Sequence, residues 1–219
     1  MNSGAIPLLV VLALVTAVPR HSPAQDMTSP PTAQGGDDFR PLDHELLNSS
    51  LPSELHVTLL ERKAIAEQEA LVFAASDRAT RRSTLAGMIA DLPAWKAGAE
   101  KGWPEAMVLL ALCYTDGVAV PQDSAEAEKW FRKAADQGNA LGQVGLGVCY
   151  RGGEGVARDP AEAVERFRQA AAQGHALGQY WLGKCYRDGE GVARDRAEAV
   201  KWFRKAADQG HKQAQELLK

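Results

Sequence analysis

The feature that most constrains this chain is an internal repeat. From residue 95 onward the sequence resembles itself when it is shifted by 36 residues, without gaps. The same period relates several residue types, for example Cys113, Cys149 and Cys185; Tyr114, Tyr150 and Tyr186; Phe131, Phe167 and Phe203; and Gly138, Gly174 and Gly210. Repetition at this length indicates an array in which each unit buries its apolar face by stacking on its neighbours.

The second half of each unit has the pattern of an amphipathic helix. It begins with Asp-x-x-Glu, as at Asp123 and Glu126. The aspartate is expected to accept hydrogen bonds from free backbone N–H groups, and the glutamate to reach back to the N–H of the aspartate. Apolar residues then recur at helical spacing, and a glycine such as Gly138 stands where a helix ends in the left-handed conformation. Asp159 and Asp195 begin the equivalent helices, and Pro160 takes the first helical position, where proline is tolerated.

The first half of each unit predicts another helix, which ends in a glycine-rich loop such as residues 152–155 or 189–191. Each unit is therefore expected to be a pair of antiparallel helices. The predicted fold class is all-α.

A known repeat family is similar to this pattern. Residues 176–211 read Ala-Leu-Gly-Gln-x-x-Leu-Gly-x-x-Tyr-x-x-Gly-x-Gly-Val-x-x-Asp and then Ala-x-x-Trp-Phe-x-x-Ala-Ala-x-x-Gly-His. This motif resembles the Sel1-like repeat, a relative of the tetratricopeptide repeat. Residues 140–175 depart from it at Arg166, and residues 104–139 depart at Val118 and Ala119. The resemblance implies a right-handed α-solenoid over residues 93–219, with full units at about 104–139, 140–175 and 176–211 and partial units at each end.

The first residues resemble an export signal. Residues 6–18 are an uninterrupted apolar run, shorter than the roughly 20 residues that a membrane-spanning helix needs. Ser22 and Ala24 fit a cleavage site, so we expect residues 1–24 to be a signal peptide and the mature chain to begin near Gln25. The expected location is periplasmic or secreted, with membrane contact only during export. An uncleaved membrane anchor is the alternative, because no Lys or Arg precedes the run.

Two segments separate this signal from the repeats. Residues 25–39 are rich in Pro, Gly, Ser and Thr and predict a disordered linker. Residues 40–92 contain apolar residues at helical spacing, including Leu59, Leu60, Ala70 and Leu71, and predict one or two amphipathic helices. We expect these helices to cover the first end of the array, since three units are near the minimum for stability.

Composition and motifs argue against several functions. A net charge of −3 and a pI near 6.0 give no basic face for nucleic acid. The cysteines occupy one position in successive units, roughly 16 to 20 Å apart, too far for a disulfide and typical of buried thiols. His44 lacks the second histidine of a zinc-protease helix. His175 and His211 are interpreted as capping residues. We therefore predict no catalytic, metal or cofactor site.

The resemblance also indicates which first-helix residues face the inner surface of the solenoid. Leu146, Gly147 and Tyr150 match the packing positions of tetratricopeptide repeats, so the positions between them should line a groove. These are Val108, Leu112 and Thr115 in the first unit, Val144, Val148 and Arg151 in the second, and Tyr180, Lys184 and Arg187 in the third.

The candidate partner-binding residues are Tyr180, Lys184, Arg187, Arg151, Val144 and Val148. Tyr180 beside this positive charge suits an aromatic anchor that receives an acidic segment. Trp181 is interpreted as packing against the next helix. A solvated helix face is the alternative interpretation of the cationic residues.

These observations predict a non-catalytic scaffold or adaptor in the cell envelope that binds an unidentified protein partner through the concave face of its repeats. The alternative is a secreted hydrolase acting on envelope peptides or glycans, which would need converging titratable groups in a pocket.

Overall fold

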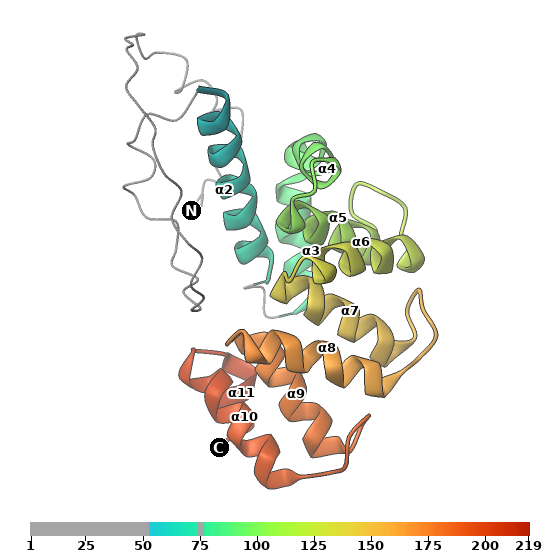
Figure 1. Cartoon of the computed structure of the whole chain (residues 1–219), viewed down its shortest axis with the longest axis vertical. Helices are drawn as coiled ribbons and strands as arrows, with labels where there is room; N and C mark the ends of the chain where they lie inside the picture. Colours follow the sequence, from blue (N-terminus) through green and yellow to red (C-terminus); the bar gives the residue numbers. More distant parts are fainter. Residues whose placement is uncertain (1–52, 74–76) are drawn as a thin grey trace, which may run out of the picture. The chain divides into compact units, whose positions relative to one another are not determined.

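The computed structural model describes residues 53–73 and 77–219 (Figure 1). The chain divides into two compact units, residues 1–61 and 62–219. Of the first unit only residues 53–61 are described, and they form the beginning of helix α2 (Ser53–Phe73). The predicted signal peptide (1–24), linker (25–39) and residues 40–52 lie outside the described residues.

Within the described residues all regular structure of the second unit is helical. After α2 come α3 (Arg78–Gly87), the short 3₁₀ helix η1 (Ile89–Asp91), α4 (Leu92–Glu100), α5 (Pro104–Asp116), α6 (Ser124–Asp136), α7 (Ala140–Gly152), α8 (Pro160–Ala172), α9 (Ala176–Asp188), α10 (Arg196–Asp208) and α11 (Lys212–Glu216). Each helix from α4 to α11 packs on the one before it, and α5, α7 and α9 also contact one another in order (Figure 1). The predicted α-solenoid of paired helices with a 36-residue period is confirmed.

Aspartates begin the second helices as predicted, but the glutamates do not complete a capping box. The carboxylate of Asp123 accepts from the N–H groups of Ala125 and Glu126, each at 3.0 Å. The N–H of Asp123 donates instead to the carbonyl of Tyr114 at 3.0 Å, which ties the start of α6 to the end of α5. Glu126 pairs with Lys129 at 2.9 Å. The reciprocal bond is therefore absent from this helix, because the preceding tyrosine carbonyl takes its donor.

Small residues allow the paired helices to approach closely. A Cβ added at Gly145 would lie 2.4 Å from the ring of Phe131, and one added at Gly147 would lie 2.6 Å from the ring of Phe167. Both rings are buried, at 3% and 0% exposure. These glycines let one first helix pack between the aromatic rings of two successive second helices.

Glutamine side chains link successive units. Nε2 of Gln173 donates to Oε1 of Gln143 at 2.8 Å and to the carbonyl of Gly138, in the preceding unit, at 3.0 Å. One unit further on, Gln209 makes the same two bonds, to Gln179 at 2.8 Å and to Gly174 at 2.9 Å. In the first unit Gln137 meets the sulfur of Met107 at 3.6 Å.

Residues 62–73 of α2 pack on the first repeat (residues 104–139) with a face that the sequence did not predict. Ile65 and Val72 are buried, at 1% and 0% exposure, whereas Leu71 is 57% exposed and Ala70 is also exposed. The prediction of a helix here is correct, but the assignment of Ala70 and Leu71 to its buried face is wrong. The buried face instead carries a glutamate, Glu69, between the two apolar residues.

Polar contacts fix this part of α2 along α4, α5 and α7. Arg62 pairs with Glu105 at 3.2 Å, and Gln68 accepts from the indole N–H of Trp95 at 2.7 Å.

Among the described residues, no helix is both long enough and apolar enough to cross a membrane.

A candidate partner-binding groove

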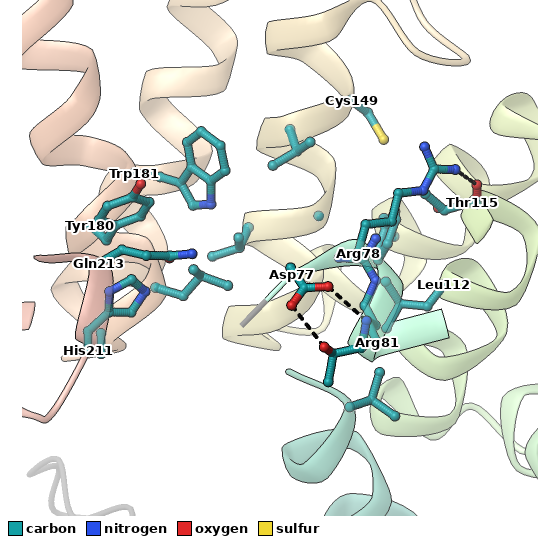
Figure 2. Close-up of a pocket in the computed structure, with 18 of the residues that line it drawn as sticks. Asp77, Arg78, Arg81, Leu112, Thr115, Cys149, Tyr180, Trp181, His211 and Gln213 are labelled. Atoms are coloured by element: carbon teal, nitrogen blue, oxygen red, sulfur yellow. Dashed lines mark hydrogen bonds between the residues drawn. The ribbon is translucent and has the colours of Figure 1, made fainter. Parts of the chain in front are cut away.

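A groove of about 810 Å³ runs over the first helices of the three units (Figure 2). Its apolar floor comes from α5, α7 and α9. One wall is the first turn of α3, with Asp77, Arg78 and Arg81, and the opposite end carries Tyr180, Trp181 and the residues His211 and Gln213 around the start of α11.

Part of the predicted set lines this groove. Val144, Val148 and Tyr180 are among the lining residues, as are Leu112 and Thr115. Val144 is only 2% exposed and belongs to the floor. Val108 is fully buried and does not line the groove, because it belongs to the core cluster that also contains Ile65 and Val72 of α2. Its assignment to the groove is therefore wrong.

Trp181 joins the predicted aromatic and cationic residues into one group. Its ring stacks on Phe167 of α8, with ring centroids 5.7 Å apart and planes at 13°, so it packs on the preceding pair rather than the next one. Nζ of Lys184 lies 4.4 Å from this ring and 5.6 Å from that of Tyr180, and the Arg151 guanidinium lies 5.1 Å from Trp181. Trp181 lines the groove, which sequence reasoning missed. The variability of position 181 between units (Leu109, Gly145, Trp181) was the signal for it.

Lys184 differs electrostatically from the arginines near it. Burial lowers its pKa, and the positive charges of Arg151 and Arg187 lower it further. Among residues 62–73 and 77–219 it makes no ion pair, and its ammonium rests on the two aromatic rings. Lys184 is thus a partly desolvated cation that forms no ion pair within the described residues, although the charge of Asp188 acts on it and raises its pKa in part.

The two predicted arginines are engaged by nearby acids. Nε of Arg151 lies 2.6 Å from Glu190, in the loop after α9, and Arg158 lies 2.9 Å from the other oxygen of that carboxylate. Burial would raise the pKa of Glu190, but the hydrogen bonds and charges of the two arginines outweigh it, and the net pKa is lowered. Arg187 pairs with Asp188 at 2.7 Å. Neither arginine lines the groove, and Lys184 does not line it either; its ammonium instead contacts the two lining rings of Tyr180 and Trp181.

A second cationic group, on α3, was not predicted. Arg78 and Arg81 both bind Asp116, the last residue of α5, each through Nε at 2.8 Å. The Asp116 side chain is fully buried, whereas that of Arg78 is 61% exposed and that of Arg81 is 25% exposed. The i, i+3 spacing of the two arginines was the signal in the sequence, but it lies outside the repeats.

The two histidines differ in their role. Nδ1 of His211 accepts from the N–H of Ala214 at 3.3 Å and caps α11, as predicted, and its ring stacks on Tyr180 at 4.6 Å. His175 makes no such bond, and its buried Nδ1 has no hydrogen-bond partner among the residues that the structure describes. Burial lowers the pKa of both rings, which disfavours their charged forms.

The cysteines are buried free thiols. Burial raises the pKa of Cys113 and Cys149 to about 12 and that of Cys185 to about 11. Thiols of this kind are poor nucleophiles and poor metal ligands. In the part of the chain that the structure describes, no group of three or more His, Cys, Asp or Glu is placed to hold a metal ion.

Known proteins share this architecture. The Sel1 repeat family model matches residues 104–139, 140–175 and 176–211. A Sel1 repeat protein from Oxalobacter formigenes of known crystal structure is 38% identical over 58% of this chain and 96% of its own, with a TM-score of 0.52. The chain belongs to the Sel1 repeat family.

A second Sel1-type structure covers more of this chain. It is a protective antigen present in uropathogenic Escherichia coli strains, described as displaying an SLR fold. It is 34% identical and has a TM-score of 0.56, covering 80% of this chain and 35% of its own. No curated protein matches the sequence. Sel1 repeat proteins are generally protein-interaction scaffolds and are typically not catalytic.

Proposed function

We propose that this Sel1 repeat protein is a non-catalytic scaffold of the cell envelope that binds an acidic segment of a partner protein in the groove. The observation that carries the proposal is Lys184, a cation without an ion pair among the described residues that rests on Trp181 and Tyr180 at one end of an apolar floor.

The chemistry of this end suits an interface. Aromatic side chains bury large areas with little loss of conformational entropy and are enriched at the centres of protein interfaces. Because Lys184 is already partly desolvated, the free-energy cost of desolvating it further is smaller when a carboxylate binds. Val144 and Val148 extend the apolar surface away from this anchor. A partner segment with an acidic residue beside apolar residues would match both features.

The envelope location rests on the sequence. The apolar run at residues 6–18 is shorter than a membrane span, and Ser22 and Ala24 fit a cleavage site. Cell fractionation and mass spectrometry of the mature N-terminus test this part. The expected result is a periplasmic or extracellular chain that begins near Gln25, and an intact chain in the cytoplasm would contradict it.

The binding proposal is tested by crosslinking in cells followed by affinity capture, with Tyr180→Ala and Lys184→Glu compared with the natural chain. Lys129→Glu is the matched control, because Lys129 is exposed on α6 and pairs with Glu126, whereas Lys184 rests on the lining rings of Tyr180 and Trp181. The proposal expects a partner that is lost with the two groove variants and kept with the control. A partner kept equally by all variants would show that binding does not use this end of the groove.

Within the part of the chain that the structure describes, no specific site supports the hydrolase alternative. The acids beside the cations of the groove, Asp116 and Glu190, are each held by two arginines. The hydrogen bonds and charges of its two arginines lower the pKa of Glu190, which disfavours a role for this acid in proton transfer.

A further inference from the structure

We propose that the groove has a second anion-binding point on α3, so that its partner segment carries acidic residues at both ends and apolar residues between them. This inference rests on the proposed function and adds the pattern of the ligand. It assigns to α3, which lies outside the repeats, a direct part in recognition.

The α3 wall presents guanidinium donors to an anion. Two guanidinium groups, those of Arg78 and Arg81, share the single carboxylate of Asp116, and Asp77 balances the second positive charge, so the wall offers exposed donors rather than a net charge. The other acid on this wall, Asp77, has both oxygens occupied by Thr80, which donates its backbone N–H and its hydroxyl at 2.8 Å each. Asp77 also lies at the N-terminus of α3, where the helix dipole offsets negative charge.

Arg78 is the group that can reach a ligand. It binds Asp116 through Nε and donates from Nη2 to the carbonyl of Thr115 at 3.0 Å, so α5 fixes the guanidinium while most of the side chain stays exposed to the groove. A fixed, solvent-facing arginine loses little entropy when it binds a carboxylate. Figure 2 shows Arg78 and Arg81 across the groove from Tyr180 and Trp181.

The middle of the groove disfavours an acidic residue. Val144 and Val148 of α7 form the floor there, and Glu154, which follows α7, contributes a negative charge to the lining. The order along the groove is therefore guanidinium donors at α3, apolar residues with one acid at α7, and the Lys184 ammonium beside the lining rings of α9.

The helix spacing sets the length of the segment. Neighbouring packed helices lie about 8 to 10 Å apart, so the Asp116 end of α5 and Lys184 of α9 are separated by two such steps, roughly 16 to 20 Å. An extended chain rises about 3.3 Å per residue. The two acidic residues of the partner are thus expected to be about five or six positions apart.

Peptide display against the full chain tests this pattern, with random twelve-residue peptides as the probe. Enriched peptides are expected to carry two acidic residues about five or six positions apart around an apolar centre. The dissociation constant of a selected, fluorescently labelled peptide is then measured for the natural chain and for Arg78→Gln, Lys184→Gln and Arg82→Gln. Arg82 is the control, since it is exposed on α3 and does not line the groove.

Arg78→Gln and Lys184→Gln are each expected to weaken binding about tenfold, and Arg82→Gln to leave it unchanged. Changing one peptide acid to its amide should remove the effect of Arg78→Gln, and changing the other acid should remove that of Lys184→Gln. Arg81 still pairs with Asp116 in Arg78→Gln, and circular dichroism checks that this variant is folded.

The possible outcomes separate this inference from the proposed function. Peptides that depend on Lys184 but bind Arg78→Gln as tightly as the natural chain, or that carry a single acidic position, would overturn the inference alone. If no enriched peptide is weakened by Lys184→Gln, both this inference and the proposed binding site are wrong.

Discussion

The side-chain amide of Asn139 joins α7 to the buried carboxyl group of Glu69. Its Nδ2 donates to Oε1 of Glu69 at 3.3 Å, while its Oδ1 accepts from the N–H of Gly142 at 2.7 Å and caps the helix. The two later units have histidine at this position, His175 and His211, and the bond to Glu69 is made by the asparagine of the first. One amide thus fixes both the start of a repeat helix and the helix outside the repeats.

The burial of Glu69 makes the stability of the fold depend on pH. Burial raises the pKa of Glu69 from 4.5 to about 8, and the charge of Glu105 adds to the rise, whereas the bond from Asn139 lowers it. Because the pKa of the folded chain is the higher one, the protonated carboxyl stabilises the fold fully below about pH 4.5, and this contribution is lost as the pH rises through 8. Glu69→Gln should remove the loss and make the chain more stable at pH 8 by roughly 1 to 3 kcal/mol.

Urea denaturation from pH 5 to pH 9 measures this difference. Glu67→Gln is the control, because Glu67 is exposed on the same helix and should leave the pH profile unchanged. A Glu69→Gln profile parallel to that of the natural chain would contradict the assignment of the raised pKa.

Asp116 is expected to be the most costly acid to replace. Asp116→Asn leaves the side chain buried and removes the charge that holds Arg78 and Arg81. Loss of a partner from a buried pair costs about 3 to 5 kcal/mol, and the exposure of Arg78 reduces the expected loss of unfolding free energy here to about 2 to 3 kcal/mol. Amide hydrogen exchange in α3 should increase as well.

The third unit supplies the matched control for this change. Asp188 occupies the same repeat position but is exposed and pairs with its neighbour Arg187. Asp188→Asn should change the free energy of unfolding by less than about 0.5 kcal/mol. Equal losses for the two variants would show that α3 is not held through Asp116.

Gly145→Ala tests the close approach of α7 to Phe131. The added methyl group would lie 2.4 Å from the buried ring, so helix or ring must move, at a cost of about 1 to 3 kcal/mol in thermal denaturation. In Gly87→Ala the new Cβ would meet nothing within 4 Å, and this variant should be as stable as the natural chain. A neutral effect of Gly145→Ala would mean that the helix pair is packed more loosely than the structure has it.

The incomplete capping box gives an unequal effect of its two acids. Asp123→Ala removes an acceptor for two backbone N–H groups and should destabilise the chain by about 1 kcal/mol. Glu126→Ala loses only an exposed pair with Lys129, worth about 0.5 kcal/mol or less. Guanidinium denaturation of both variants measures their free energies of unfolding. Similar decreases for the two variants would indicate that Glu126 accepts a hydrogen bond from the N–H of Asp123 in solution.

The regular part of this fold could be predicted because each signal in it recurs. The caps at Asp123 and its equivalents, the buried rings at Phe131 and its equivalents, and the two-helix unit all follow from local rules of spacing and capping. The prediction that Val144 and Val148 line the groove followed from the resemblance to tetratricopeptide repeats.

The remaining features depend on contacts between residues far apart in the sequence. Glu69 lies on the buried face of α2, whereas Leu71 faces solvent, because Asn139 and Trp95 fix the rotation of the helix through polar contacts. Glu190 engages Arg151 from a loop in the next unit. No spacing rule within a single helix could predict these pairs.

Met107 stands where the later units have a glutamine, and this difference bears on how the chain unfolds. The later junctions are each joined by a glutamine that bonds across two units, but Gln137 meets only a thioether, so the coupling of neighbouring units is weaker where the array begins. Residues 62–73 of α2 cross this junction, with Gln68 bound to Trp95 on one side and Arg62 bound to Glu105 on the other. The helix thus couples α4 to α5. We expect this short array to unfold cooperatively instead of unfolding first at its N-terminal repeat.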